Sequence, residues 1–249
     1  MRHLCHRGVL PSRQIVVRSV VSGHKGYMTA DGSIYCVGRN YVDHIKELPS
    51  LLSIPDELPT SPMIFMKGPG TIVRGAQLLI PKWSSNVQHE VELAVQLGSD
   101  LQPSAAAISI DLTARDVQAD LKRLGHPWAL SKSFKGSCPL GNSFSLDTID
   151  PQQLTISLSV NGAMRQQVDT LKMIFKISEI LSYLKYRFPL QPGDWILTGT
   201  PEGVAAIKEG DIVTASASDR NGVILSEGRW KVELDPESGS VDEWRDNVK

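Results

Sequence analysis

The chain has 249 residues, an apolar fraction of 41% and a formal net charge of −1, and this length allows one large domain or two small ones. The balanced charge argues against a nucleic acid, a membrane surface or a polyanion as partner, and the apolar runs are too short to span a membrane. Three widely separated cysteines without a Cys-x-x-Cys pair argue against a zinc ribbon or redox pair and favour a reducing compartment.

Residues 1–30 are rich in arginine and histidine and precede the first acidic residue, Asp31. This composition is typical of a mitochondrial transit peptide, so we predict a mitochondrial location. The alternative is a basic N-terminal strand over residues 14–21, which include several valines, in a cytoplasmic protein. We therefore expect a basic segment over residues 1–30, one folded domain over residues 31–234 and a frayed polar tail over residues 235–249.

The first elements of the domain are short. The pattern predicts strands over residues 33–37 and 63–66, and a helical turn over residues 40–48 that ends before Pro49. Residues 51–62 contain three prolines and are predicted to form a loop.

A helix is predicted over residues 114–124, with Thr113 as its cap and Gly125 and Pro127 as stop signals. The face that we expect it to bury is its apolar stripe, Ala114, Val117, Leu121 and Leu124.

The second half of the chain is predicted to form two further strands and a helix. Residues 155–160 alternate and meet Asn161-Gly162, a strong hairpin signal. An amphipathic helix over residues 177–184 and a strand over residues 195–197 follow. Many short strands with few helices predict an α+β fold built on a β core.

Two glutamates lie on one face of a predicted strand over residues 90–97. This segment alternates strictly, so the side chains of Glu90 and Glu92 point the same way while the opposite face is wholly aliphatic. Two acids on a half-buried strand are usually just solvated. On a packed strand, however, adjacent like charges are unfavourable unless water or a cation relieves them. All-oxygen ligands favour Mg²⁺, Mn²⁺ or Ca²⁺ over zinc.

A second polar group is Asp111, Arg115 and Gln118. If the helix begins near Asp111, the spacings of four and three place these three residues on one face. They could then bind a metal, a substrate carboxylate and a water, because arginine presents a planar fork of donors to a carboxylate. The alternative is an ordinary helical Asp–Arg pair, which contributes little.

Other candidate residues are weak signals individually. Glu47 follows His44 by three residues, and a carboxylate beside an imidazole raises its basicity and fixes its tautomer, as a general base requires. Such a pair is nevertheless common on surfaces, and Lys132 resembles any solvated lysine. In the segment Thr198-Gly-Thr200, the glycine would let backbone donors approach a ligand. The alternative is that this segment forms a simple turn at the end of a strand.

Several motifs occur in order along the chain: Cys36-Val-Gly-Arg-Asn-Tyr41 with His44 and Glu47, His89-Glu-Val-Glu-Leu-Ala-Val95, Asp111-Leu-Thr-Ala-Arg-Asp-Val-Gln118, Ser131-Lys-Ser-Phe134, Asn161-Gly162 with Arg165-Gln166, and Leu197-Thr-Gly-Thr-Pro201. This ordered set, which extends from about residue 34 to about residue 232, resembles the fumarylacetoacetate hydrolase family. The likeness is greatest to its small single-domain branch, the acylpyruvases that also act on oxaloacetate.

The resemblance implies a mixed β-sandwich roll, usually a homodimer, that binds Mg²⁺ or Mn²⁺. The family's metal ligands fall on Glu90, Glu92 and Asp111. Its His–Glu dyad, which activates the hydrolytic water, falls on His44 and Glu47.

The resemblance also assigns residues to the substrate. The family's active-site lysine falls on Lys132, its polar residues beside the metal aspartate on Arg115 and Gln118, and its substrate-contacting threonine on Thr200. The implied substrate is a small 2-keto acid that reacts through a metal-bound enolate. The reactions are C–C hydrolysis of acylpyruvates and decarboxylation or keto–enol tautomerisation of oxaloacetate.

The chain departs from the family pattern just before Asp111, where the resemblance implies roughly ten more residues than those between Gly98 and Asp111. This shortening could displace a metal ligand. It therefore leaves open a catalytically impaired scaffold of the same fold. A third interpretation is an isomerase of unsaturated keto diacids, which the His44–Glu47 dyad disfavours because an isomerase needs no water nucleophile.

Overall fold

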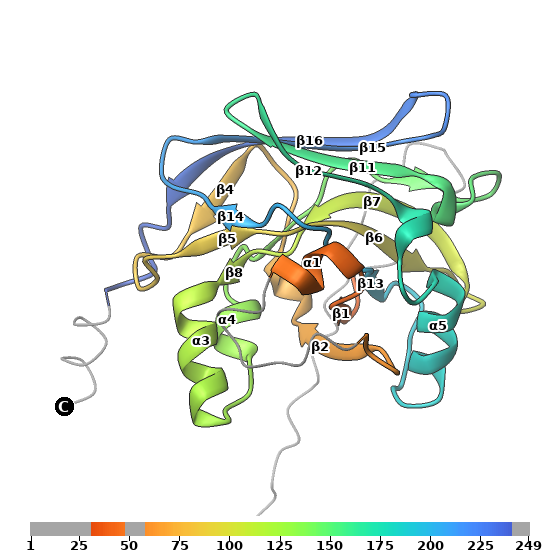
Figure 1. The fold of residues 1–249 in the computed structure, drawn as a ribbon, viewed down its shortest axis with the longest axis horizontal. Coiled ribbons are helices and arrows are strands. Elements are labelled where there is room, and N and C mark those ends of the chain that lie inside the picture. Colours follow the sequence, from red (N-terminus) through yellow and green to blue (C-terminus); the bar gives the residue numbers. More distant parts are fainter. Residues whose placement is uncertain (1–30, 48–57, 241–249) are drawn as a thin grey trace, which may run out of the picture.

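The alternating segments form strands, and most of these strands build two sheets that pack face to face (Figure 1). The structure is a computed structural model that describes residues 31–47 and 58–240. The predicted transit peptide, its alternative strand and residues 241–249 of the predicted tail lie outside the described residues.

The first sheet is mixed, because β1 pairs parallel with β13 and antiparallel with β2. Its strands, in spatial order, are β10 (Phe144–Ser145), β7 (Pro103–Ile110), β6 (Val91–Leu97), β13 (Trp195–Leu197), β1 (Ile34–Gly38) and β2 (Met63–Lys67).

The second sheet covers β6 and β7 of the first (Figure 1). Its strands, in spatial order, are β12 (Ala163–Asp169), β11 (Thr155–Val160), β15 (Ile212–Ser218), β16 (Ile224–Leu234) and β4 (Gln77–Ile80). Two small sheets consist of β14 (Ala205–Ala206), β5 (Val87–His89) and β8 (Thr113–Ala114), and of β3 (Ile72–Val73) and β9 (Cys138–Pro139).

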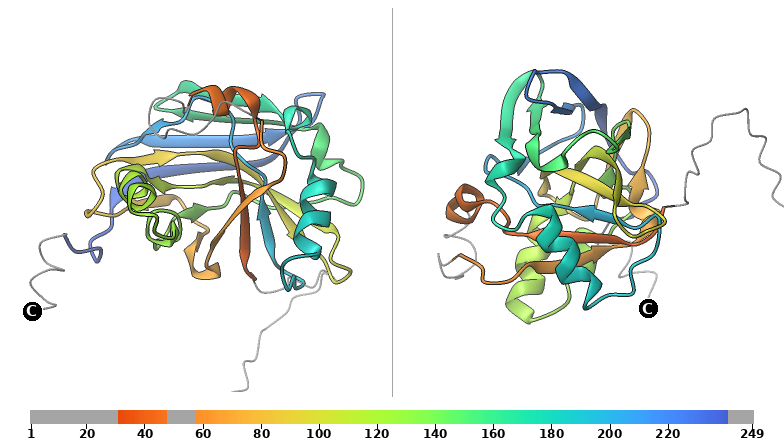
Figure 2. Two further views of the ribbon diagram at one scale, coloured as in Figure 1. Left: turned by 60° about the horizontal axis from the view of Figure 1, so that its bottom comes forward. Right: turned by 90° about the vertical axis from the view of Figure 1, so that its right-hand side faces the viewer.

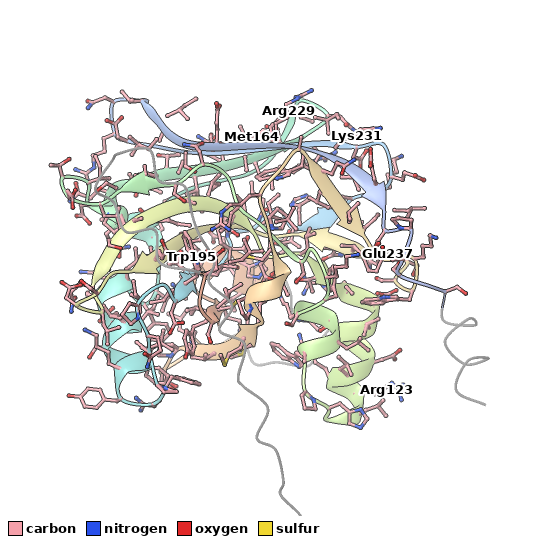
Figure 3. The ribbon with its side chains drawn as sticks, turned by 180° about the vertical axis from the view of Figure 1, so that it is seen from behind. Arg123, Met164, Trp195, Arg229, Lys231 and Glu237 are labelled. Carbon is pink, nitrogen blue, oxygen red and sulfur yellow. The ribbon has the colours of Figure 1, made fainter. Side chains whose placement is uncertain are left out.

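The main core lies between the two large sheets. Leu93 and Ile108 of the first sheet and Trp230 of the second belong to one buried apolar cluster, and complete burial of such a side chain contributes about 1.5–3 kcal/mol. Figure 3 shows Met164 and Arg229 on the outer face of the second sheet, away from this core.

The helices lie at the margins of the first sheet, with α3 and α5 on opposite sides of the molecule (Figure 2). They are α1 (Val42–Glu47), α3 (Arg115–Leu124), α4 (Ala129–Lys132) and α5 (Ile177–Lys185), with 3₁₀ turns η1 (Pro69–Thr71), η2 (Pro151–Gln153) and η3 (Thr170–Lys172). No helix in the described part of the chain is both long and apolar enough to cross a membrane.

The predicted helix after Asp111 forms, but its cap and its buried face differ from the prediction. Its N-cap is Ala114, not Thr113, and Gly125 ends it in the left-handed conformation. The buried residue of α3 is Gln118, whereas Leu124 of the predicted apolar stripe is 52% exposed. The reason is that α3 borders a polar cleft rather than the core, so its polar face turns inward.

The hairpin predicted at Asn161-Gly162 is confirmed. Both residues have positive φ angles, 52° and 79°, as a two-residue turn between twisted strands requires. Strands β11 and β12 pair antiparallel on either side of it.

The shortened segment before Asp111 forms a tight hairpin. Residues 98–102 join β6 to β7, closed by a hydrogen bond from the Gly98 amide to the Gln102 carbonyl of 2.8 Å. The ladder continues to the pair Val91 and Ile110. The Asp111 amide then donates to the Glu90 carbonyl at 2.8 Å, so the short connection still places Asp111 beside Glu90 at the start of β6.

Candidate active site and metal centre

Three carboxylates meet where β5, β6 and β7 end or begin. Glu90 occupies the break between β5 and β6, Glu92 lies in β6, and Asp111 directly follows β7. One carboxylate oxygen from each lies within 4.8 Å of the others, and all three residues are at least nine-tenths buried. Asp111 is not part of α3, so the predicted row of Asp111, Arg115 and Gln118 on one helical face is wrong. The aspartate comes from the adjacent strand instead.

Cationic side chains surround the triad. Lys132 Nζ donates to Glu90 Oε2 and to Asp111 Oδ2, each at 2.6 Å, and Arg115 pairs with the other oxygen of Glu90. Burial opposes the charge of Glu90, but Lys132 and Arg115 outweigh it and lower the pKa of that carboxyl. Burial, reinforced by Asp111 and Glu90, raises the pKa of Glu92 well above its usual value.

The triad fits a hard divalent cation. It offers only carboxylate oxygens, which Mg²⁺ and Mn²⁺ prefer. Asp111 Oδ1 is buried and accepts no hydrogen bond from the described residues. Lys67 Nζ lies 2.9 Å from this oxygen, but the pair does not have the geometry of a hydrogen bond. The raised pKa of Glu92 means that its negative charge lacks sufficient compensation from the protein. An additional cation would supply that compensation.

The sequence interpretation missed Lys67. Its ammonium is completely buried, pairs with Asp111, and donates to the carbonyls of Leu112 at 3.2 Å, Ser137 at 2.9 Å and Lys132. A lysine at the end of a strand gives no sequence signal for such a role. Only the convergence of carbonyls from three segments of the chain on one ammonium reveals it.

The cleft in front of the triad collects most of the predicted site residues. His44, Arg115, Gln118, Lys132 and Thr200 line it together with the three carboxylates. Glu47 does not line the cleft. It stands behind His44, with its Oε2 3.5 Å from His44 Nδ1, and the Gly203 amide donates to both of its oxygens at 3.1 Å.

The segment Thr198-Gly-Thr200 approaches the triad through its backbone. The Gly199 amide donates to Glu92 Oε2 at 2.6 Å. Gly199 has a φ of 99°, and a Cβ there would lie 2.7 Å from that of Asn40, so only glycine fits. This segment therefore holds Glu92 as well as presenting Thr200.

Further positioning residues behind the cleft also escaped the sequence interpretation. Gln166 Nε2 donates to Thr200 Oγ1 at 2.9 Å, while its Oε1 lies 3.0 Å from His89 Nδ1. Gln88 accepts from Arg115 Nε at 2.8 Å. Gln166 and His89 occur within the ordered motifs, which was the only available signal for them.

The chain belongs to the fumarylacetoacetate hydrolase family. The family model described as "Fumarylacetoacetate (FAA) hydrolase C-terminal" matches residues 33–227, most of the chain. This confirms the predicted family and its mixed α+β fold.

The chain is similar to proteins whose names state an enzymatic activity. The chain is 42% identical over 214 residues to the mitochondrial oxaloacetate tautomerase FAHD1 of Rattus norvegicus, covering 81% of this chain and 91% of the relative. It is 41% identical over 196 residues to the oxaloacetate tautomerase YcgM of Escherichia coli (strain K12), covering 74% and 87%. Among solved structures, fumarylpyruvate hydrolase from Pseudomonas aeruginosa in complex with Mn²⁺ and pyruvate matches with a TM-score of 0.75, 30% identity and coverage of 85% and 94%.

Proposed function

We propose that this chain is a Mg²⁺- or Mn²⁺-dependent enzyme that acts on small 2-keto acids through an enolate. Its candidate reactions are keto–enol tautomerisation or decarboxylation of oxaloacetate and C–C hydrolysis of acylpyruvates. The observation that carries the proposal is the carboxylate triad Glu90, Glu92 and Asp111, whose ligand oxygens lie within 4.8 Å in the same cleft as His44 and Lys132. The names of the similar oxaloacetate tautomerases and of the fumarylpyruvate hydrolase support the substrate class.

Glu90, Glu92 and Asp111 would hold the cation. When bound, the cation supplies positive charge that stabilises the developing enolate oxygen. Lys132 and Arg115 already border the carboxylates, so each can donate to an anionic substrate with little rearrangement. Gln118, which accepts from Arg115 at 2.8 Å, keeps that guanidinium oriented toward Glu90.

His44 is the proposed proton carrier. Its Nδ1 faces Glu47, which leaves Nε2 as the nitrogen that takes a proton from substrate carbon or from water. Tautomerisation of oxaloacetate needs proton transfer from the substrate carbon, and hydrolysis of an acylpyruvate needs proton transfer from water. Decarboxylation of oxaloacetate needs neither transfer, because loss of carbon dioxide itself generates the enolate.

The hairpin over residues 98–102 argues against a scaffold without metal, because Asp111 lies beside Glu90 despite the short connection. The alternative function, isomerisation of unsaturated keto diacids, would use the same triad. It differs from the leading proposal in its substrate. Turnover of an unsaturated keto diacid but of neither oxaloacetate nor acetylpyruvate would establish it.

Metal removal tests the first part of the proposal. Treatment of the purified protein with EDTA is expected to abolish oxaloacetate and acetylpyruvate turnover, and excess Mn²⁺ is expected to restore it. A zinc-only recovery would contradict the all-oxygen site, and unchanged activity after chelation would refute metal dependence.

His44→Gln tests the proton carrier, because glutamine has a similar reach but cannot titrate. We expect tautomerisation and hydrolysis to fall by about 10²–10⁴-fold, the usual contribution of a general base, while decarboxylation is retained. Equal loss of all three reactions would show that His44 is structural. Lys46→Gln, an exposed change on the same helix, is the control and should leave all three rates unchanged.

We further propose a mitochondrial homodimer with residues 1–30 as the targeting segment. The basic, acid-free composition of these residues and the mitochondrial name of the rat relative support the location. A fusion of the full chain to a fluorescent protein that stays cytoplasmic would refute it. Light scattering of the purified protein tests the dimer.

A further inference from the structure

A second group of side chains lines the same cleft and has no role in the reaction proposed above. It consists of one lysine on α3, the tryptophan that precedes α4, and two apolar residues of β2: Lys122, Trp128, Met63 and Phe65. We call this group the outer subsite. It shares the cleft with the carboxylate triad, and the free space in the cleft is about 50 Å³.

Lys122 is a half-buried cation that has no anionic partner among the described residues. Its ammonium lies 4.6 Å from the centroid of the Trp128 ring, and no carboxylate of the described residues lies within ion-pairing distance of it. Desolvation, followed by repulsion from Arg115 and Lys132, lowers the pKa of Lys122 to about 8. An incoming anion would offset these two effects, because a nearby opposite charge favours the charged ammonium.

The position of Lys122 aligns it with the inner site. Arg115, Gln118 and Lys122 follow at spacings of three and four residues, so they share the face of α3 that borders the cleft. Seven residues of helix rise about 10 Å, so this face extends from the carboxylate Glu90 at one end to Lys122 at the other. A ligand held beside the triad can therefore extend along this face toward Lys122.

The charge balance of the cleft favours a ligand with two negative charges. Lys67, Lys132 and Arg115 pair with Glu90 and Asp111, so these two carboxylates are already matched by three cations. Lys122 is additional to this balance. A resident divalent cation would increase the positive excess further.

The remaining members of the outer subsite shield this interaction from water. Trp128 packs on Phe65 with ring centroids 6.1 Å apart, and Lys132 Nζ lies 4.8 Å from the centroid of the Phe65 ring. An apolar wall lowers the local dielectric and strengthens an ion pair made beside it.

We propose that Lys122, held over Trp128, binds the second carboxylate of the substrate, so that this enzyme prefers 2-keto dicarboxylic acids over 2-keto monocarboxylic acids. This inference rests on the proposed function, since it assumes that the first carboxylate and the keto group are held at the triad. It assigns to Lys122 selection of the substrate and no part in the chemical step.

The kinetic test compares a diacid, oxaloacetate, with a monoacid, acetylpyruvate. Lys122→Met should lower kcat/KM for oxaloacetate roughly 10- to 100-fold through KM, the scale of one hydrogen bond to a charged group. It should change kcat/KM for acetylpyruvate less than about 3-fold, and Lys122→Arg should restore most of the loss. Equal losses for the two acids, or no loss for oxaloacetate, would overturn the proposal.

The matched control is Arg123→Met. It removes the same charge from the adjacent residue of α3, whose side chain is 70% exposed and pairs with Asp120. Figure 3 shows Arg123 at the end of α3 far from the sheets. If this variant lost oxaloacetate selectivity as Lys122→Met does, the effect would be one of net charge and the subsite would be refuted.

Binding without turnover separates this proposal from the proposed function. Calorimetric titration of the Mn²⁺-loaded protein with malate, a diacid, and pyruvate, a monoacid, should show that Lys122→Met weakens malate about 10-fold or more and leaves pyruvate unchanged. This outcome supports the outer subsite even if neither keto acid is turned over, in which case only the proposed function fails. Equal weakening of the two ligands refutes the subsite.

A pH profile gives an independent reading of Lys122. Groups near its ammonium are Arg115, Lys132 and Arg39, which favour proton loss, and Glu90, which opposes it. Because the lysine is charged below its pKa, kcat/KM for oxaloacetate should fall as the pH rises through about 8. Lys122→Arg should remove this decrease, and its persistence in that variant would assign the titration to another group.

Discussion

Asp111→Asn is expected to abolish calorimetrically detectable Mn²⁺ binding and to lower keto acid turnover by at least about 10²-fold. The substitution preserves the size of the side chain but removes the charge of one of the three carboxylates proposed to hold the metal. It also replaces the carboxylate that accepts from Lys132 at 2.6 Å and pairs with Lys67. The remaining two glutamates would face three cations, so a divalent cation would meet weaker attraction and stronger repulsion.

The control for this prediction is Asp120→Asn. Asp120 lies on the exposed side of α3, and its pair with Arg123 is solvent-accessible on both sides, so its removal should leave metal binding and turnover unchanged. Retained Mn²⁺ affinity in Asp111→Asn would mean that the triad is not the metal site. Lost binding with retained turnover would instead exclude the metal from the reaction.

Much of the fold follows from local patterns in the sequence. Alternation located β6 and β11, and the positive φ angles that Asn161 and Gly162 adopt are those their residue types favour. The spacing of Glu90 and Glu92 indicated a shared direction because strand geometry alone determines it. These features could be predicted because each is determined by residues that lie close together in the sequence.

The position of Asp111 could not be derived from spacing. The helical spacing of Asp111, Arg115 and Gln118 suggested a shared helical face on the condition that the helix begins near Asp111. In the structure the helix starts at Arg115, and the carboxylate reaches Glu92 across the β6–β7 ladder. The hairpin over residues 98–102 fixes that register, and no helical pattern encodes it.

The buried face of α3 was also unpredictable from its apolar pattern. A stripe containing Val117, Leu121 and Leu124 normally marks the packed side of a helix. Here Gln118 is buried and Leu124 is exposed, because the neighbouring surface is the polar cleft. The role proposed for Lys122 could not be predicted for the same reason, because it depends on contact with Trp128 and on the charges across the cleft.

Lys67 is the other feature that only the folded chain reveals, and its removal should have the largest effect on stability. Lys67→Met is expected to lower the free energy of unfolding by about 3–5 kcal/mol, the scale for breaking a buried ion pair by removing one partner. The methionine fills similar space but leaves Asp111 Oδ1 and the carbonyls of Leu112 and Ser137 without their cation. Urea denaturation with the enzyme free of metal measures this loss.

Lys135→Met is the matched control, because this lysine is exposed on the adjacent loop and should leave the unfolding midpoint unchanged. An equal shift in that variant would show that the effect is not specific to burial.

A double-mutant cycle with Asp111→Asn tests whether the ion pair is the cause. If Lys67 acts chiefly by balancing Asp111, the second substitution should cost less in the Asp111→Asn background, with a coupling of roughly 0.5–3 kcal/mol. Additive effects would instead mean that the three carbonyls, not the carboxylate, account for the stabilisation by Lys67. Such a result would separate two roles of the Lys67 ammonium. One role is to hold the segments that follow β7 and α4, and the other is to orient Asp111 toward the proposed metal.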